Sequence, residues 1–305
     1  MENQTSDILL LEGLQVSPDA SIPAFILLLL IYIFIMFSNI VLVILITLDS
    51  SLHQPMYLLF CNMSINDVFG ATTIFPRMLR DIFIASSDRY IHYVDCVIQA
   101  FCVHIYAGSS HTILMIMAFD RYVAICNPLQ YATIMTNWMV VKLSVLAWAV
   151  IFVMVTILVG LSVRLSRCRW IIFNPFCDNA SLFNSHVKMF YGLGSAMAKM
   201  ACSLCSVTIT YLRISMVCLS RKNQALNSKA LQTCAHLTVY IILLLSGNII
   251  IILHRFENLS DHRKLASILF HVVPPSLNAI IYGHQIKAVR EKNHLLYRDI
   301  RNKNK

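Results

Sequence analysis

One long run without any charged residue, at positions 24–48, constrains this chain more than any other feature. At about 1.5 Å per residue a helix of this length reaches about 37 Å, enough to cross a hydrocarbon core of about 30 Å with some tilt. The run is too long for the apolar part of a cleavable signal peptide, and no Lys or Arg precedes it. It therefore predicts a membrane-spanning helix.

The composition supports the same class of protein. Of the 305 residues, 58% are hydrophobic types and only 13% are charged, whereas soluble domains usually carry about 25% charged residues. Six further apolar segments predict an all-α membrane protein, a bundle of seven transmembrane helices, with a tail at 1–23, a membrane domain at 24–283 and a basic tail at 284–305. The predicted spans are 24–48, 56–79, 92–119, 138–163, 189–217, 231–253 and 265–282.

The charges at the two ends set the expected orientation. Four acidic residues and no basic one precede Ala24, whereas seven Lys or Arg lie between Lys287 and Lys305. Lys and Arg favour the cytoplasmic side, so we expect the N-terminus outside and the C-terminus inside. The net charge of +9 then belongs largely to a tail near anionic lipid and does not indicate nucleic acid. Asn3, in the sequon Asn-Gln-Thr, would be a glycosylation site on the outside.

An acid and a base end the third apolar segment. Asp120 and Arg121 follow the run ILMIMAF at 113–119, which places them where the third helix leaves the membrane on the cytoplasmic side. One interpretation is an ion pair that is closed in one state and opens in another, so that Arg121 can meet a partner protein. The other is a simple interfacial anchor, with Arg121 reaching toward the lipid headgroups.

The residues around this pair carry a resemblance to a known family. Residues 117–131 read MAFDRYVAICNPLQY. Four further motifs follow the same pattern: LHQPMY at 52–57, SIND at 64–67, SKALQTC at 228–234 and PPSLNAIIY at 274–282. Together they resemble the vertebrate odorant receptors, a family of rhodopsin-like G-protein-coupled receptors, and look closest to its class I, fish-like branch. The resemblance covers nearly the whole predicted membrane domain.

The resemblance implies a switch at the cytoplasmic end. Asp120, Arg121 and Tyr122 match the triplet that couples this family to a G protein, with Arg121 as the switch. Tyr211 and Tyr282 would be the partners of Arg121 in the active state. The remaining cytoplasmic coupling residues would be Arg221, Lys222 and Lys229.

Asp67 is an acid in the middle of the second predicted span. Such a residue is costly in hydrocarbon, so it should face the bundle interior. We expect it to meet Asn39 and Asn278 in a polar network that differs between states. A purely structural hydrogen-bond cluster is the alternative.

Two cysteines match the family's disulfide. Cys96 matches the bridge from the third helix to the second outer loop, and the resemblance implies Cys177 as its partner. An outside location permits the bond, which would hold the loop over an outer pocket; two free thiols are the alternative. Cys202 and Cys205 form a CxxC inside the fifth span, where small buried residues are favoured over metal or redox chemistry.

The third helix offers His104, Gly108 and His111 on related turns for a ligand pocket. Arg255 ends the sixth span on the outer side. A His and an Arg over an apolar cavity would suit a carboxylate with a short hydrocarbon tail, because Arg binds carboxylates bidentately, and the class I resemblance points to water-soluble acids too. The alternatives are a solvated charge or lipid anchor for Arg255 and a hydrogen bond within the bundle for His104. The other lining residues would be Tyr106, Ala107, Ser110 and Ile252.

Three positions depart from the family's pattern. The second outer loop lacks a third cysteine near 185–188. Only Ala235 separates Cys234 from His236, where the family usually has two residues, and one residue turns a helix by about 100°. Ala279 stands where a proline is common. These differences leave open a divergent or poorly functional member.

Three classes of membrane protein compete for this chain. A transporter or channel for a small polar solute would need repeats, broken helices or rings of charge, and the chain has one mid-span acid and no repeat. An enzyme would need a clustered nucleophile, acid–base pair or metal set. We therefore expect a multi-pass plasma-membrane receptor that is not an enzyme. It would bind a small odorant and activate a stimulatory, olfactory-type heterotrimeric G protein, raising cyclic AMP, with membrane lipid around it and without a cofactor, metal or nucleic acid.

Overall fold

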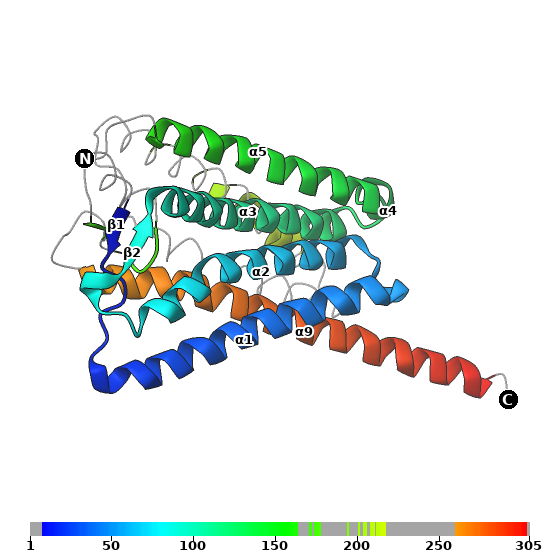
Figure 1. Cartoon of the computed structure of the whole chain (residues 1–305). Coiled ribbons are helices and arrows are strands. Elements are labelled where there is room, and N and C mark those ends of the chain that lie inside the picture. The colour runs from blue at the N-terminus through cyan, green and yellow to red at the C-terminus, as the bar shows by residue number, and fades with distance from the viewer. Residues whose placement is uncertain are drawn as a thin grey trace.

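The structure is a computed structural model, and within the residues it describes the chain forms a bundle of long helices with a small sheet at one end (Figure 1). The helices are α1 (Pro18–Leu48), α2 (Pro55–Asp81), α3 (Tyr93–Cys126), α4 (Tyr131–Ile134), α5 (Asn137–Val163) and α9 (Ser260–Lys303). The strands are β1 (Ile8–Leu11), β2 (Tyr90–His92) and β3 (Ile171–Ile172). The described residues are 8–163, 171–172, 174–177, 194, 201, 204–205, 208–210, 212–217 and 260–303.

Five helices in the described part are long and apolar enough to cross a membrane: α1, α2, α3, α5 and the His262–His284 part of α9. They correspond to the first four predicted spans and the seventh, so the prediction of a helical membrane bundle is confirmed. The sixth predicted span, 231–253, and most of the fifth, 189–217, lie outside the described residues.

The ends of the helices follow from local chemistry. α1 and α2 both begin at a proline, whose fixed φ suits the first helical position and whose missing N–H is not needed there. α3 continues past Asp120 to Cys126, because no Gly or Pro interrupts the chain before Pro128. α9 also runs on without a break from the seventh span to Lys303, through the predicted boundary between membrane domain and tail.

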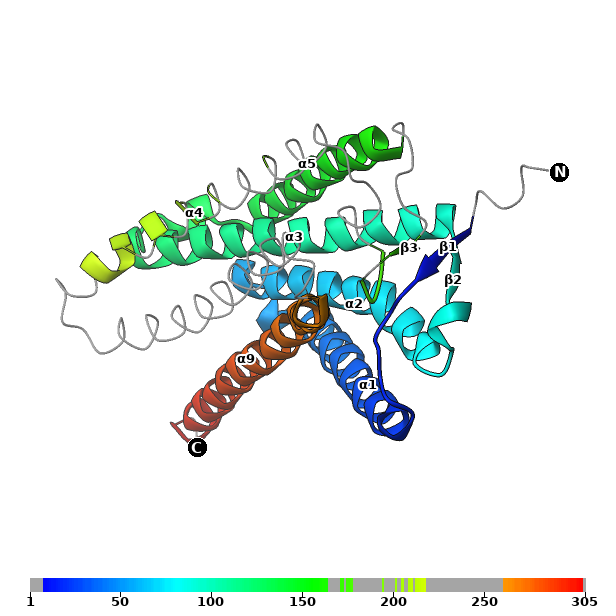
Figure 2. The same cartoon turned by 90° about the vertical axis from the view of Figure 1, so that its left-hand side faces the viewer.

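The centre of the bundle is formed by α2 and α3. α2 contacts α1, α3, α5 and α9, and the end view in Figure 2 shows α5 on one side of α3, with α1 and α9 on the other side of α2. The most apolar windows of α2 and α3 are 56% and 61% buried, against 22% and 28% for α1 and α5. Large apolar side chains such as Phe37 and Leu146 are exposed on these outer helices. Helices that are apolar all round and exposed on one side are typical of contact with lipid.

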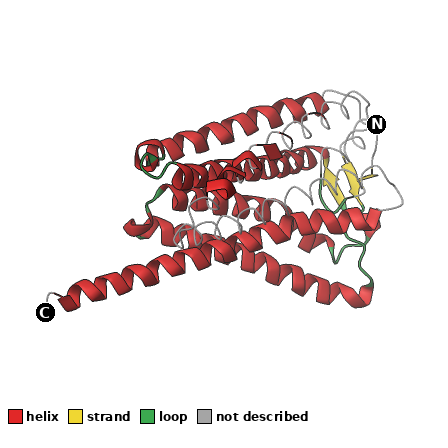
Figure 3. Ribbon diagram, turned by 180° about the vertical axis from the view of Figure 1, so that it is seen from behind, coloured by secondary structure: helices red, strands yellow, loops and turns green. Residues whose placement is uncertain are grey.

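The sheet joins three distant parts of the chain. β1 is the central strand: it pairs antiparallel with β2 and parallel with β3. Leu9 and Leu11 are buried against Ile172 and Cys177, whereas Ile8 is exposed, which is the alternation a half-buried strand requires. Figure 3 shows the strands together at one end of the helices. We call this the sheet end, and the opposite end of α3 the Arg121 end; the sequence did not predict the sheet.

Candidate functional site

The Arg121 end contains a compact polar cluster at the end of α3. Asp120 is 1% exposed and accepts hydrogen bonds from Arg121 Nε at 3.0 Å and from the hydroxyl of Tyr131, on α4, at 2.8 Å. Burial, and then the Asp120 carboxylate, raise the pKa of the Tyr131 phenol well above its usual value, so the hydroxyl keeps the proton that it donates. Arg121 is thus held against its own helix by a carboxylate that a second residue fixes in place.

The surroundings of this cluster come from α2. Met56, Leu59 and Phe60 lie around Asp120 and Arg121 and leave no space for a water molecule between them. These apolar walls exclude water from one side of the ion pair, and charge-assisted hydrogen bonds are stronger in such surroundings. The pair is therefore a positioned, partly buried contact, and its role as a switch stays a prediction.

A second polar cluster lies in the middle of the bundle. Asp67 is fully buried, and its Oδ2 accepts a hydrogen bond from Asn278 Nδ2 at 3.0 Å. The Tyr282 hydroxyl lies 3.3 Å from Asn278 Oδ1, and its ring stacks on Phe60 with centroids 4.1 Å apart. A chain of contacts therefore links α2 to α9. Asn39 is also fully buried, but its amide donates to the carbonyl of its own helix at Ile35, at 3.0 Å, and its expected meeting with Asp67 stays a prediction.

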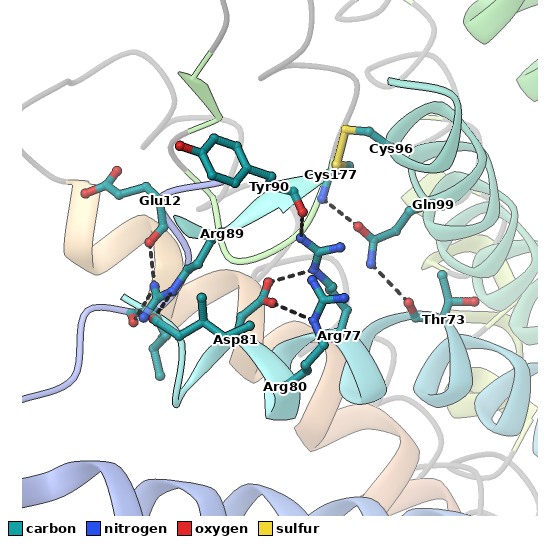
Figure 4. Close-up of polar contacts among 12 residues, drawn as sticks. Glu12, Thr73, Arg77, Arg80, Asp81, Arg89, Tyr90, Cys96, Gln99 and Cys177 are labelled. Atoms are coloured by element: carbon teal, nitrogen blue, oxygen red, sulfur yellow. Dashed lines mark hydrogen bonds and ion pairs between the residues drawn. A yellow bond between two sulfur atoms is a disulfide. The ribbon is translucent and has the colours of Figure 1, made fainter. Parts of the chain in front are cut away.

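The sheet end is tied together covalently. Cys96 on α3 and Cys177 form a disulfide, as the resemblance implied. The backbone N–H of Cys177 donates to Gln99 Oε1 at 3.0 Å, and Gln99 Nε2 donates to the carbonyl of Thr73 on α2 at 3.1 Å (Figure 4). One line of bonds thus runs from the segment after β3, through α3, into α2.

Hydrogen bonds from Arg89 and one ion pair hold the segment that follows β1 in place. The guanidinium of Arg89 donates to the carbonyls of Glu12 and Leu14, at 2.6 and 3.0 Å, and to that of Ile84 at 2.9 Å. The Glu12 side chain forms an ion pair with Lys264 at the start of α9, at 2.9 Å. In Figure 4 Arg89 lies beside Glu12, and Arg77 and Arg80 both reach Asp81. The N-terminal segment is therefore connected to both β2 and α9.

The predicted pocket residues of α3 fall into different environments. Gly108 lies against α5, since an added Cβ would be 2.8 Å from Ile151 Cγ2, and a small residue lets two membrane helices approach closely. Its role in ligand binding stays a prediction. Ala107 packs on the main core cluster. His104 and His111 are half-buried, and a role for them in ligand binding stays a prediction.

Comparison with known proteins assigns the chain to a family. The family model described as "Olfactory receptor" matches residues 28–298. The chain belongs to the olfactory receptor family. It is 36% identical over 291 residues to human olfactory receptor 4E1, covering 92% of this chain and 90% of that one. It is 34% identical over 277 residues to human olfactory receptor 52Z1P, covering 88% and 92%, and 32% identical over 270 residues to human olfactory receptor 52N2, covering 85% and 84%.

Membership of the olfactory receptor family confirms several expectations. The protein is a multi-pass plasma-membrane receptor and not an enzyme. Its assignment to the class I branch stays a prediction. Several residues expected to act in this olfactory receptor lie outside the described part of the chain: Asn3, Tyr211, Arg221, Lys222, Lys229, Ile252 and Arg255.

Sequence reasoning missed several residues that the structure brings into polar contacts, among them Tyr131, Lys264 and His271. Tyr131 is the last residue of the family motif at 117–131. Its separation from Asp120 in the sequence did not indicate a hydrogen bond between the two side chains. Lys264 directly precedes the seventh predicted span and could have been noted as a charge at a helix start; its partner Glu12 could not. His271 lies inside an apolar run, where a single His gives no periodic signal.

Proposed function

We propose that this receptor binds a small odorant within the sheet-end half of the bundle and then activates a stimulatory, olfactory-type G protein at the Arg121 end, raising cyclic AMP. In this proposal the sheet end is extracellular and the C-terminal tail cytoplasmic. The disulfide supports that orientation, because disulfides persist in oxidising surroundings. The basic tail supports it as well.

The contact among Arg121, Asp120 and Tyr131 carries the proposal. It holds the guanidinium in a closed position at the end of a buried helix, and such a contact can serve as one state of a two-state element. An odorant shifts the balance between states only by binding one of them more tightly. Release of Arg121 would expose a cationic side chain to the G protein, with Tyr211 and Tyr282 as its new neighbours and Tyr122 beside it.

For the odorant itself we propose a polar, water-soluble molecule, with a carboxylate as the first candidate. His104 and Arg255 would bind the carboxylate, and Ala107, Gly108, His111 and Ile252 would surround the hydrocarbon part. An Arg–carboxylate pair is strong where both groups leave water together and the contact is bidentate.

Cyclic AMP should be measured in cells that express the receptor with a stimulatory olfactory-type G protein, against short acids, alcohols, aldehydes, ketones and amines. We expect a response that Arg121→Ala abolishes while surface staining persists. Loss of the acid response alone in Arg255→Ala would support the carboxylate pocket. A response that survives Arg121→Ala would contradict the switch, and responses to non-acids that ignore Arg255→Ala would contradict the carboxylate pocket.

Tyr131→Phe should raise activity in the absence of odorant. The substitution removes one hydroxyl, and a hydrogen bond to a charged group contributes about 1.5–3 kcal/mol. Because Asp120 would lose one of the bonds that position it, the closed contact with Arg121 should weaken, and basal cyclic AMP per receptor at the surface should rise by about tenfold or more. Tyr90→Phe, at the opposite end of the molecule, is the matched control and should leave basal cyclic AMP unchanged. Equal basal activity in both variants would contradict a holding role for Tyr131.

A further inference from the structure

Four polar residues lie on the buried face of α9, and they follow one another after three, four and seven positions in the sequence. Lys264, Ser267, His271 and Asn278 are exposed by only 3, 2, 5 and 0%, and their spacing places them on one side of the helix. A buried polar group is costly unless it has a partner. Lys264 has Glu12, and Asn278 has Asp67, which leaves His271 to be explained.

Only one of the two ring nitrogens of His271 has a hydrogen-bond partner among the described residues. Its Nδ1 lies 2.7 Å from the carbonyl oxygen of Ser267. A carbonyl can only accept, so Nδ1 carries the proton, and in the neutral ring Nε2 then offers a lone pair. Nε2 is buried, and no hydrogen-bond partner for it occurs in the part of the chain that the structure describes. His271 therefore presents an unused hydrogen-bond acceptor inside the bundle.

A second unused polar atom belongs to the neighbouring ring of Tyr106, on α3. The Tyr106 and His271 ring centroids are 5.4 Å apart. The Tyr106 hydroxyl is buried near the Ser110 side chain, and it makes no hydrogen bond of full geometry among the described residues. The position of Tyr106 is fixed, because Asn66 Nδ2 donates to its carbonyl at 3.2 Å and Gly70 allows its ring to lie directly against α2. The hydroxyl can donate or accept.

The remaining walls around His271 are aromatic. Phe176 crosses its ring edge-on with centroids 5.0 Å apart, and Phe270 does so at 4.9 Å. Phe176 directly precedes Cys177, so the disulfide to α3 holds this wall in place. The surroundings therefore combine one acceptor and one hydroxyl with an apolar lining, which suits a ligand with one polar group and a hydrocarbon body.

We propose that His271 and Tyr106 form a polar subsite for the hydroxyl group of an aliphatic alcohol. The hydroxyl of the ligand donates to His271 Nε2, and its oxygen accepts from the Tyr106 hydroxyl. A methyl ether of the same alcohol lacks the proton that His271 requires, and a carboxylate brings negative charge against the Nε2 lone pair. The inference rests on the proposed binding of a small ligand in the sheet-end half of the bundle, and it names the residues and the chemical class for one part of that site.

Thermal unfolding of the purified full-length receptor in lipid nanodiscs tests the subsite without any G protein. The ligands are butanol, hexanol and octanol, each with its methyl ether, and hexanoate; the ethers report the effect of hydrocarbon on the lipid alone. We expect at least one alcohol to raise the melting temperature more than its ether does. Tyr106→Phe and His271→Phe should each weaken the apparent affinity for that alcohol about five- to tenfold. Tyr32→Phe removes a hydroxyl from a ring that stacks on Phe75 of α2 and is not in ring contact with His271 or Tyr106, and it should leave that affinity unchanged.

Each result separates the subsite from the broader proposal. If no alcohol exceeds its ether, or if both variants keep the preference for the alcohol, the two polar atoms hold water only and the subsite is wrong. If alcohols stabilise the receptor through Tyr106 and His271 but never raise cyclic AMP, the subsite stands and the coupling proposal fails. If acids act through His104 and Arg255 while alcohols produce no shift, the coupling proposal stands and the subsite fails.

Discussion

Gly70→Ala should strongly destabilise the receptor, because an added Cβ would lie 2.3 Å from Cδ2 of the Tyr106 ring and 2.6 Å from its Cε2. Real contacts of this kind are far longer, so either the ring or α2 must move. The ring cannot move easily, since Asn66 holds the Tyr106 backbone and Phe270 and His271 pack beside the ring. Overpacking in a dense core costs about 1–3 kcal/mol and occasionally more. A lower melting temperature and less receptor at the cell surface should result.

The chain provides matched controls for this substitution. An added Cβ on Gly160 of α5 would meet nothing within 4 Å, so Gly160→Ala should be neutral or stabilise the helix by up to about 1 kcal/mol. Gly108→Ala should be intermediate, because its nearest contact is Cγ2 of Ile151 at 2.8 Å, an atom of a side chain that can rotate. Melting temperatures that fail to follow the order Gly160→Ala, Gly108→Ala, Gly70→Ala from highest to lowest would contradict the packing of Tyr106 on α2.

Cys177→Ser should be at least as damaging. The bond to Cys96 closes a separation of 81 residues, and removal of a native disulfide typically costs about 2–5 kcal/mol. The loss also frees the backbone N–H that reaches Gln99 and the wall formed by Phe176. We expect little receptor at the cell surface and a melting temperature lowered by several degrees in the purified protein.

Two further variants separate the bond from the loss of a cysteine as such. Cys102→Ser changes a free, half-buried cysteine of the same helix and should have a small effect. The double variant Cys96→Ser with Cys177→Ser should be about as stable as Cys177→Ser alone, because both substitutions remove the same bond. Additive losses from the two substitutions would contradict the disulfide.

The long helices could be predicted from the sequence because their signal is local. An uncharged run of sufficient length specifies a membrane helix whatever lies around it, and α1, α2, α3, α5 and the apolar part of α9 follow from such runs. Their ends were less predictable, since α3 continues past its predicted end to Cys126 and α9 runs through Pro274 and Pro275 as far as Lys303. The buried position of Asp67 could also be predicted, because an acidic side chain inside a membrane span is energetically costly unless it has a polar partner.

The sheet and several polar contacts could not be predicted, since each depends on residues far apart in the chain. β1 has four residues, too few for a periodic signal, and its partners lie near residues 90 and 171. The hydrogen bond between Tyr131 and Asp120 needs the turn after Pro128, and the contact of His271 with Tyr106 needs two helices to meet. The disulfide was foreseen only because the family resemblance supplied the pair.

The central position of β1 has a consequence for how the receptor matures. This strand precedes all the membrane helices in chain order, yet one of its neighbours, β3, is synthesised only after four of them. Until then β1 can pair with β2 on one edge, but the backbone groups of its other edge have no neighbouring strand. The sheet around β1 is therefore completed only after most of the described membrane helices have been made. An antibody against the unpaired β1 segment would recognise receptors whose assembly is incomplete and would lose its epitope when the strand takes its place.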